Sequence, residues 1–339
     1  MIQVFKPSLT LKDKISVLKA MYRNNISGTS PSVKEFEDSL RMNFNTKYVS
    51  TVSNGSAALD LSLKVLNLNR NDEVVVPSHT IISCLSAILR GNAKPVFCDV
   101  DKNTWNMRLV DIEKVVTKKT KAVLMVHTYG LPTEAKKIKE YCKSKNLILI
   151  EDAAEAHGQT ESGELCGSFG DISTFSFYAN KHITTGEGGA VLTNSEVFYE
   201  KINKMRNLDF NNNERFKHEH LYWNYRMGGL QAALGVSQSK QLYKTIKNKI
   251  KQGNYYQKLL SEYQHIVQLP LIEHNGSQNH YWVFGLIIKK DNIRDKVMET
   301  LKEMNIETRP FFWPLHLQPA LPKNYREPSN SLPISENMG

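Results

Sequence analysis

Short apolar runs alternate with amphipathic segments over the first 240 residues of the chain. Apolar runs that are too short for helices and bounded by polar residues are typical of buried strands in a parallel sheet. Such runs lie at residues 48–52, 73–76, 95–100, 122–126, 147–150 and 173–177. Helical spacing of apolar residues predicts helices at residues 10–24, 33–44, 54–67, 134–145, 196–206 and 228–238. This alternation predicts an α/β fold with a mainly parallel sheet that is covered on both faces.

The pattern changes after residue 240, where we place a domain boundary. Residues 241–263 form a long charged helical segment, residues 281–288 are strand-like, and residues 291–304 are helical. We therefore expect a large domain at residues 1–240 and a smaller α/β domain at residues 241–339. A polar loop at residues 207–220, with three consecutive asparagines, precedes the boundary.

Polar residues gather where two of the expected strands end. Asp152 comes just past the strand at 147–150, whereas the strand at 173–177 delivers Ser176 and, after a turn, Lys181. Ligands of open α/β sheets bind outside the carboxyl ends of the strands, so these side chains are expected to face one ligand. Glu151 precedes Asp152, and its side chain should point the other way because extended residues alternate faces. A glycine-rich turn at residues 184–189 lets the backbone approach that ligand closely.

This set of residues suits pyridoxal phosphate chemistry. A lysine amine forms a Schiff base with the aldehyde of that cofactor, and a carboxylate pairs with its pyridinium nitrogen. Lys181 and Asp152 are the candidate catalytic residues for these two tasks. Taken singly, Asp152 could cap a turn and Lys181 could be a surface lysine. The helix start at residues 55–57 adds free backbone amides and a helix dipole, which together favour a phosphate.

Five motifs resemble those of the DegT/DnrJ/EryC1/StrS sugar aminotransferases, and they occur in the family's order. They are NGSAAL at residues 54–59, VPSHT at 76–80, EDAAEAHG at 151–158, FSFY at 175–178 with Lys181, and WNYRM at 223–227. The resemblance implies the aspartate aminotransferase fold, which is fold type I of pyridoxal phosphate enzymes, with a smaller carboxyl-terminal α/β domain. It also implies transfer of an amino group from L-glutamate to a keto sugar.

The resemblance further implies roles for individual residues. Lys181 would hold the cofactor and shuttle protons, and Asp152 would pair with its ring nitrogen. The other implied cofactor contacts are Gly55, Ser56, Ala57 and Ser176 at the phosphate, His79 stacked on the ring, Glu155 near the ring hydroxyl, and Asn224 from the second subunit of a homodimer with shared active sites. Many relatives carry glutamine where Glu155 stands. The implied substrate contacts are Ser27, His182, Glu187, Arg226, Arg309 and His316.

The resemblance leaves the keto sugar open. The segments at residues 177–181 and 184–189 are most similar to members that act on a GDP-linked 4-keto-6-deoxy sugar for surface polysaccharide. A similar branch aminates an eight-carbon keto sugar acid, of the octulosonate type, that carries no nucleotide. A related dehydratase has histidine in place of the Schiff-base lysine, so the lysine at position 181 favours transamination. A non-catalytic regulatory protein on this scaffold would be expected to have lost Lys181 or Asp152.

Composition narrows the class of protein. An apolar content of 40% and a charged content of 23% are ordinary for a soluble enzyme. The net charge of +10 comes from lysines scattered along helices, which argues against nucleic acid and leaves a role in steering anionic substrates. No apolar run approaches the roughly 18 residues of a membrane span, so we expect a cytoplasmic protein without a membrane partner.

Cysteine and histidine spacing gives no reason to expect a metal. The four cysteines are widely spaced without a C-x-x-C pair, which favours buried free thiols. The sequence HEH at residues 218–220 lies in a charged loop and is expected to be solvated. Relatives continue beyond the position of residue 339 with more strand and helix, so the chain is expected to be truncated.

Overall fold

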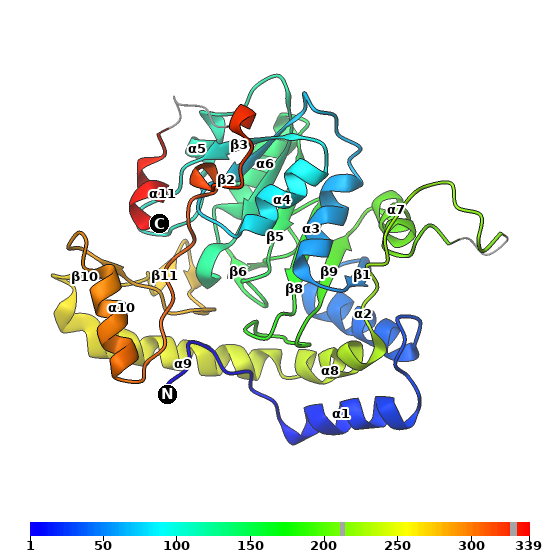
Figure 1. Ribbon diagram of the computed structural model, residues 1–339, viewed down its shortest axis with the longest axis horizontal. Coiled ribbons are helices and arrows are strands. Elements are labelled where there is room, and N and C mark those ends of the chain that lie inside the picture. The colour runs from blue at the N-terminus through cyan, green and yellow to red at the C-terminus, as the bar shows by residue number, and fades with distance from the viewer. Residues whose placement is uncertain (211–213, 326–330) are drawn as a thin grey trace.

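A seven-stranded sheet forms the centre of the protein in a computed structural model that describes residues 1–210, 214–325 and 331–339. The strand order is β1-β9-β8-β5-β4-β2-β3 (Figure 1). β9 runs antiparallel to both of its neighbours, and the other neighbouring pairs are parallel. The prediction of a mainly parallel α/β fold is therefore confirmed. The strands are β1 (Tyr48–Val52), β2 (Glu73–Pro77), β3 (Lys94–Cys98), β4 (Thr120–Val126), β5 (Ile148–Asp152), β8 (Ile172–Ser176) and β9 (Gly189–Thr193).

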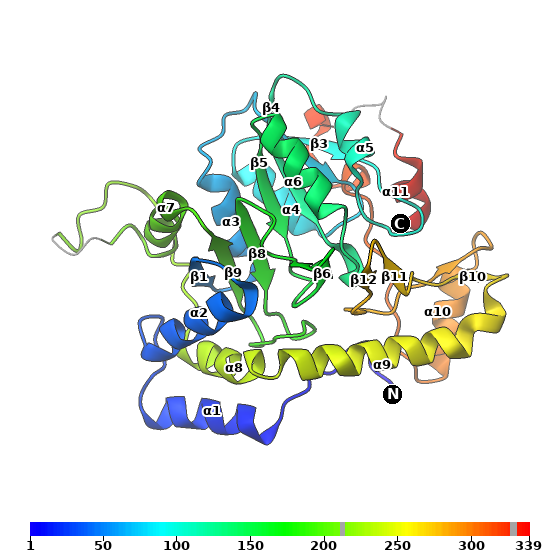
Figure 2. The ribbon, with the colours of Figure 1, turned by 180° about the vertical axis from the view of Figure 1, so that it is seen from behind.

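Helices cover both faces of this sheet because its strands are apolar on both sides. Val74 and Val76 point to one face and Val75 to the other, as the two-residue period of a strand requires. The first face carries α3 (Gly55–Lys64), α4 (Ile82–Arg90) and α7 (Glu196–Arg206) (Figure 1). The second carries α2 (Pro31–Phe44), α5 (Leu109–Glu113), α6 (Ala135–Ser144) and α8 (Gly229–Ser239) (Figure 2).

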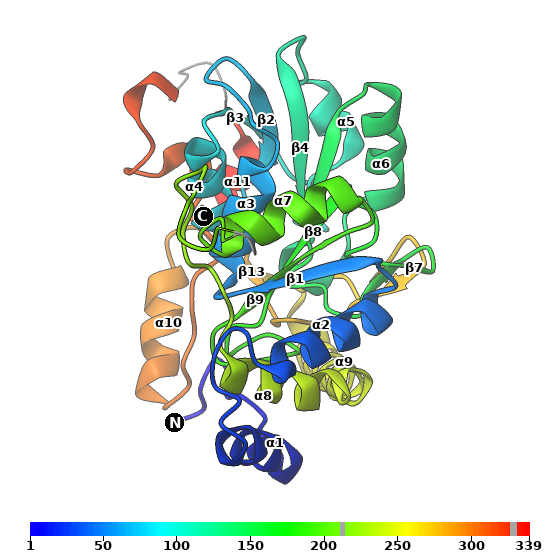
Figure 3. The same cartoon turned by 90° about the vertical axis from the view of Figure 1, so that its right-hand side faces the viewer.

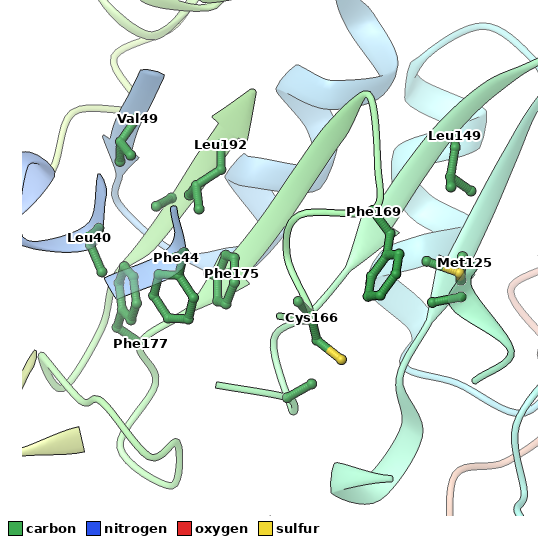
Figure 4. Packing of buried hydrophobic residues seen from close by; sticks show 14 of the residues in the cluster. Leu40, Phe44, Val49, Met125, Leu149, Cys166, Phe169, Phe175, Phe177 and Leu192 are labelled. Atoms are coloured by element: carbon green, nitrogen blue, oxygen red, sulfur yellow. The ribbon is translucent and has the colours of Figure 1, made fainter. Parts of the chain in front are cut away.

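The larger apolar cluster lies under the second face. Phe44 and Leu40 of α2 approach Phe175, Phe177 and the sheet strands in the close view of Figure 4. α8 packs between α2 and α1 (Leu11–Tyr22), which begins after a Thr10 cap (Figure 3). The cysteines are all free and buried, as expected.

α9 (Leu242–Leu260) follows α8 directly and extends past the edge of the sheet to the carboxyl-terminal elements (Figures 1 and 2). The expected boundary near residue 240 falls between these two helices and stays a prediction. The elements that follow are β10 (Val267–Gln268) paired with β13 (Ile287–Ile288), β11 (Glu273–His274) paired with β12 (Ser277–Gln278), α10 (Arg294–Glu303) and α11 (Pro333–Met338). A small hairpin, β6 (Thr160–Glu161) with β7 (Glu164–Leu165), lies between β5 and β8.

The expected strand at residues 281–288 is wrong, since only Ile287 and Ile288 pair as a strand. Tyr281 has a φ of +48°, which is incompatible with an extended strand, and its side chain is buried against α9. Burial of the large side chains at 281 and 282 therefore explains the apolar run. α4 and β9 had no prediction of their own.

The described parts of the polar loop expected at residues 207–220, namely 207–210 and 214–220, lie away from the sheet (Figure 1). Its three asparagines, residues 211–213, lie outside the described residues. His218 and Glu219 are exposed, and His220 bonds to Asp209, which agrees with a solvated loop rather than a metal site. None of the described helices has the length and apolar character that crossing a membrane requires.

Gly253 allows Tyr281 to dock on α9, and this contact predicts a stability change. A Cβ at position 253 would overlap the Tyr281 ring, which is only 1% exposed. Overpacking costs about 1–3 kcal/mol and outweighs the gain of about 1 kcal/mol that alanine brings to a helix. Gly253→Ala should therefore lower the free energy of unfolding in urea. Asn254→Ala, on the exposed side of α9, should change it by less than about 0.5 kcal/mol. Equal stability of the two variants would contradict this packing.

Candidate active site

Asp152 is the last residue of β5 rather than a residue just past its end, and its side chain is buried. One carboxylate oxygen accepts a hydrogen bond from the Ala154 amide at 3.0 Å. The other accepts one from the Cys84 thiol at 3.6 Å. Burial raises the pKa of Asp152 above its ordinary value, and the Ala154 amide and the Lys181 charge reduce that rise. The carboxylate thus lies at the carboxyl edge of the sheet, in a site that excludes most water.

Glu151 points to the opposite face and is fully buried there. It accepts hydrogen bonds from the Phe169 amide at 2.9 Å, the Gly170 amide at 2.8 Å and His127 Nε2 at 2.9 Å. Burial alone would raise the pKa of Glu151, but these hydrogen bonds and the charge of His127 lower it overall. Glu151 therefore fastens the loop before β8 to the end of β5.

Lys181 lies in the turn that follows β8, with its side chain 9% exposed. Its amine is 3.5 Å from a Glu155 carboxylate oxygen and 3.7 Å from the centre of the Trp282 ring. Burial lowers the pKa of Lys181, and the carboxylates of Glu155 and Asp152 partly restore it. A buried lysine of lowered pKa carries more neutral amine near pH 7, which is the nucleophilic form.

Glu155 faces the same amine from the loop after β5. Its carboxylate accepts a hydrogen bond from the Tyr129 backbone amide at 2.8 Å. Burial raises the pKa of Glu155 to about 7, although Lys181 opposes this rise. Glu155 is therefore a mixture of carboxylic acid and carboxylate at neutral pH. Unlike a glutamine, it can gain or lose a proton within the site.

The start of α3 provides a candidate phosphate site. Gly55 lies so close to Ser176 that a Cβ at position 55 would be 2.7 Å from the Ser176 Cβ. The Ser56 hydroxyl is 2.8 Å from that of Ser83, at the start of α4. The Ala57 amide already donates to the Asn54 side chain at 2.8 Å. Within the described residues only the Gly55 and Ser56 amides of this trio lack an acceptor. The expected phosphate contact of Ala57 stays a prediction.

His79 is fully buried at the end of β2, near three aromatic rings. Neither of its ring nitrogens forms a hydrogen bond of normal geometry with a described residue. Burial lowers the pKa of His79 to about 4, so the ring is neutral at physiological pH. A flat, neutral ring with unpaired nitrogens beside the Tyr129 ring, at 5.7 Å between centres, fits a role in stacking on a cofactor.

The expected substrate residues lie farther out, with one exception. Ser27 and Glu187 are exposed, and Arg226 packs its Cβ next to Gly28. Arg309 is exposed and pairs with Glu307 at 3.4 Å. His316 bonds to the Ser78 hydroxyl at 2.6 Å and to Glu336 at 3.2 Å.

His182 is the exception, because it is buried beside His157, with 6.2 Å between the two ring centres. Burial lowers the pKa of His182 well below its ordinary value, and the electrostatic effect of its neighbours, the Lys249 charge among them, adds to this lowering. The expected substrate contact from His182 stays a prediction.

Sequence reasoning did not single out Cys84, Ser83 or Trp282. Cys84 and Ser83 belong to α4, which had no prediction of its own, and both reach the site from the start of that helix. Trp282 lay in an expected strand. Its contact with Lys181 joins positions 101 residues apart, and no local pattern reports such a contact.

The profile of the DegT/DnrJ/EryC1/StrS aminotransferase family matches residues 10–339. The chain belongs to this family. The GDP-perosamine synthase of Escherichia coli O157:H7 is 37% identical over 338 residues, which cover 100% of this chain and 91% of that protein. The GDP-perosamine synthase of Vibrio cholerae is 35% identical over 324 residues, which cover 94% of this chain and 87% of that protein.

Solved structures agree with this assignment. The aminotransferase TlmJ from Streptoalloteichus hindustanus has a TM-score of 0.93 at 27% identity, covering 100% of this chain and 91% of that one. The E. coli GDP-4-keto-6-deoxy-D-mannose-3-dehydratase with bound hydrated PLP has a TM-score of 0.85 at 25% identity, covering 92% of this chain and 85% of that one. The predictions of a sugar aminotransferase and of pyridoxal phosphate as its cofactor are confirmed.

The residues of this aminotransferase fit that cofactor. Free amides at Gly55 and Ser56 suit its phosphate, a buried carboxylate at Asp152 suits its ring nitrogen, and the Lys181 amine suits its aldehyde. Among the described residues, one group of three could hold a metal ion, namely His127, Glu151 and Cys166. The hydrogen bonds that Glu151 accepts from backbone amides give it a structural task instead.

Glu151 binds the backbone whereas Asp152 faces the lysine. Substitution of Glu151 is therefore predicted to lower stability, and substitution of Asp152 to lower activity. Glu151→Gln places an amide N–H group among backbone donors, so we expect it to lower the free energy of unfolding by at least about 2 kcal/mol. Asp152→Asn should keep the stability but lose activity by several orders of magnitude, because an amide cannot hold a proton on the ring nitrogen. Urea unfolding and turnover with glutamate measure the two effects. The reverse pattern would show that the two acids have been assigned wrongly.

Proposed function

We propose that this aminotransferase converts a nucleotide-linked 4-keto-6-deoxy sugar into an amino sugar, with L-glutamate as the amino donor. The observation that carries the proposal is the convergence of Lys181, Asp152 and Glu155 beside the free amides at the start of α3. The similarity to GDP-perosamine synthases supports a GDP-linked substrate. The reaction would take place in the cytoplasm and supply surface polysaccharide such as O-antigen.

When bound, pyridoxal phosphate supplies an aldehyde that takes up amines and a ring that accepts electrons. The chain's own residues would do the rest. The Asp152 carboxylate keeps a proton on the ring nitrogen, while the Gly55 and Ser56 amides hold the phosphate together with the hydroxyls of Ser176 and Ser83. These contacts fix the ring before any substrate arrives.

Lys181 would move the proton between the carbons of cofactor and substrate. Its lowered pKa makes the neutral amine available as a base at neutral pH. Glu155, with a pKa of about 7, can give a hydrogen bond to the ring hydroxyl in its acid form or accept one in its carboxylate form. Water access is limited, because both side chains are 9% exposed.

The outer residues would bind the substrates. Arg226 and Arg309 are the cations to which anionic groups of a nucleotide sugar or of glutamate could pair, with Ser27, Glu187 and His316 as polar contacts. A non-catalytic role on this scaffold is disfavoured, because a protein without activity would be expected to have lost Lys181 or Asp152 and both are present.

The first test asks whether Lys181 holds the cofactor. Purified protein should absorb visible light, lose that absorption on borohydride treatment, and carry the label on Lys181 in a peptide map. Lys181→Ala should carry none. Lys249→Ala removes another partly buried lysine and should keep the label.

The same protein should then be assayed with glutamate and a panel of keto sugars. We expect the highest kcat/KM for a GDP-linked 4-keto-6-deoxy sugar and lower values for dTDP-linked ones. Turnover of the nucleotide-free eight-carbon keto sugar acid alone would favour the alternative substrate and overturn the proposed one.

A homodimer with shared active sites is part of the proposal. Leu221 and Trp223 are 99% and 71% exposed, which is unusual for large apolar side chains and suits a surface covered by a second copy. Asn224 between them and α8 is exposed, and its side-chain oxygen accepts only the Arg226 amide, at 3.2 Å, among the described residues. The N–H groups of the Asn224 side-chain amide remain available for the phosphate of a cofactor bound in the partner subunit.

Mixing two inactive variants tests this arrangement. In a hybrid of Lys181→Ala and Asn224→Ala subunits, one site keeps both residues if Asn224 reaches across the interface. We expect up to a quarter of wild-type activity in an equimolar mixture, because about half of the dimers are hybrids and each has one intact site of two. Proven subunit exchange without recovery of activity would show that Asn224 serves its own chain.

A further inference from the structure

The amine of Lys181 has an aromatic neighbour from a distant part of the chain. Its nitrogen lies 3.7 Å from the centre of the Trp282 ring, within the range of a cation–π contact. The indole N–H of Trp282 donates to the carbonyl of Asn180 at 3.0 Å, directly before Lys181 in the sequence. The ring is therefore attached to the lysine turn by its edge while its face meets the amine.

The ring is also fixed from behind, so it cannot follow the lysine if the lysine moves. Trp282 is 8% exposed and lies nearly parallel to the Tyr129 ring, at 6.1 Å between centres. The Trp282 backbone packs on Gly130, where an added Cβ would lie 2.6 Å from the backbone nitrogen of Trp282. The preceding Tyr281 is 1% exposed and sits against Gly253 of α9.

We propose that Trp282 is a positioning residue that holds the Lys181 amine over its ring face whenever that amine is not joined to the cofactor. The inference rests on the proposed function, in which a substrate amine displaces Lys181 and Lys181 must later return. A free lysine side chain loses up to about 2 kcal/mol of rotamer entropy on ordering. The indole face on one side and the Glu155 carboxylate on the other keep the released amine in place, because both attract its N–H bonds.

Cofactor capture by the apoprotein measures this positioning directly. When pyridoxal phosphate is mixed with apoprotein, the observed rate of appearance of the lysine-bound absorption should rise hyperbolically with cofactor concentration. The half-saturating concentration then reports non-covalent binding, and the limiting rate constant reports capture by Lys181. Borohydride trapping and peptide mapping identify the captured lysine in each variant.

We expect Trp282→Leu to lower the limiting rate constant about tenfold or more, with less than about a twofold change in the half-saturating concentration. Trp282→Phe keeps a weaker aromatic face and should lower the limiting rate constant about threefold. Trp105→Leu is the matched control, since Trp105 is 3% exposed in the same aromatic cluster but packs on Phe311 and Tyr129. It should capture cofactor at the wild-type limiting rate.

Three results would overturn the proposal. One is a wild-type limiting rate in Trp282→Leu, or in Trp282→Phe if the leucine variant does not fold. Another is an equal loss in Trp105→Leu, which would mean that any damage to the cluster slows capture. The third is a change confined to the half-saturating concentration. Failure of the proposed function looks different, because wild-type protein would then form no borohydride-stable adduct on Lys181.

Discussion

The alternation of side chains at the end of β5 is the constraint on which the site depends. Glu151 and Asp152 are adjacent in sequence, yet one binds backbone amides on one face and the other faces the lysine on the opposite face. The buried network around Glu151 holds the strand end rigid. Because of that rigidity, Asp152 is presented in a fixed direction without needing an ion pair of its own.

Burial controls the charges around that carboxylate. It lowers the pKa of His79 to about 4 and of His157 to about 3, so both rings are neutral at physiological pH. The cationic charge in the centre of the site then rests on Lys181, with Asp152 and Glu155 as its acidic neighbours. One basic side chain and two acidic side chains suit a cofactor whose ring nitrogen gains a proton. One carboxylate balances the charge of the lysine, and the other balances the charge of the protonated ring nitrogen.

The sheet and the positions of Asp152 and Lys181 beside it could be predicted from the sequence because both have local patterns. Apolar runs marked β1, β2, β4, β5 and β8, and the motifs around Asp152 and Lys181 indicated that Asp152 lies at the end of β5 and Lys181 in the turn after β8. The features that could not be predicted from the sequence depend on tertiary packing. Tyr281 packs on α9 and Trp282 packs beside the Tyr129 ring instead of pairing as a strand, and the Asn54 side chain accepts a hydrogen bond from the Ala57 amide, which only side-chain geometry reveals. The burial of His182 likewise depends on residues of distant segments.

Because Tyr281 packs on α9, a movement of that helix would shift Tyr281 and the neighbouring Trp282. Leu242 to Gly253 spans about 17 Å of helix, so a tilt of about 3° at the start of α9 would shift Gly253 by roughly 1 Å. Shifts of this size at reacting groups can change rates up to about a hundredfold. Substitutions at the junction of α8 and α9 are therefore expected to act on the Lys181 turn through Tyr281 and Trp282, without a change in any residue of the site itself.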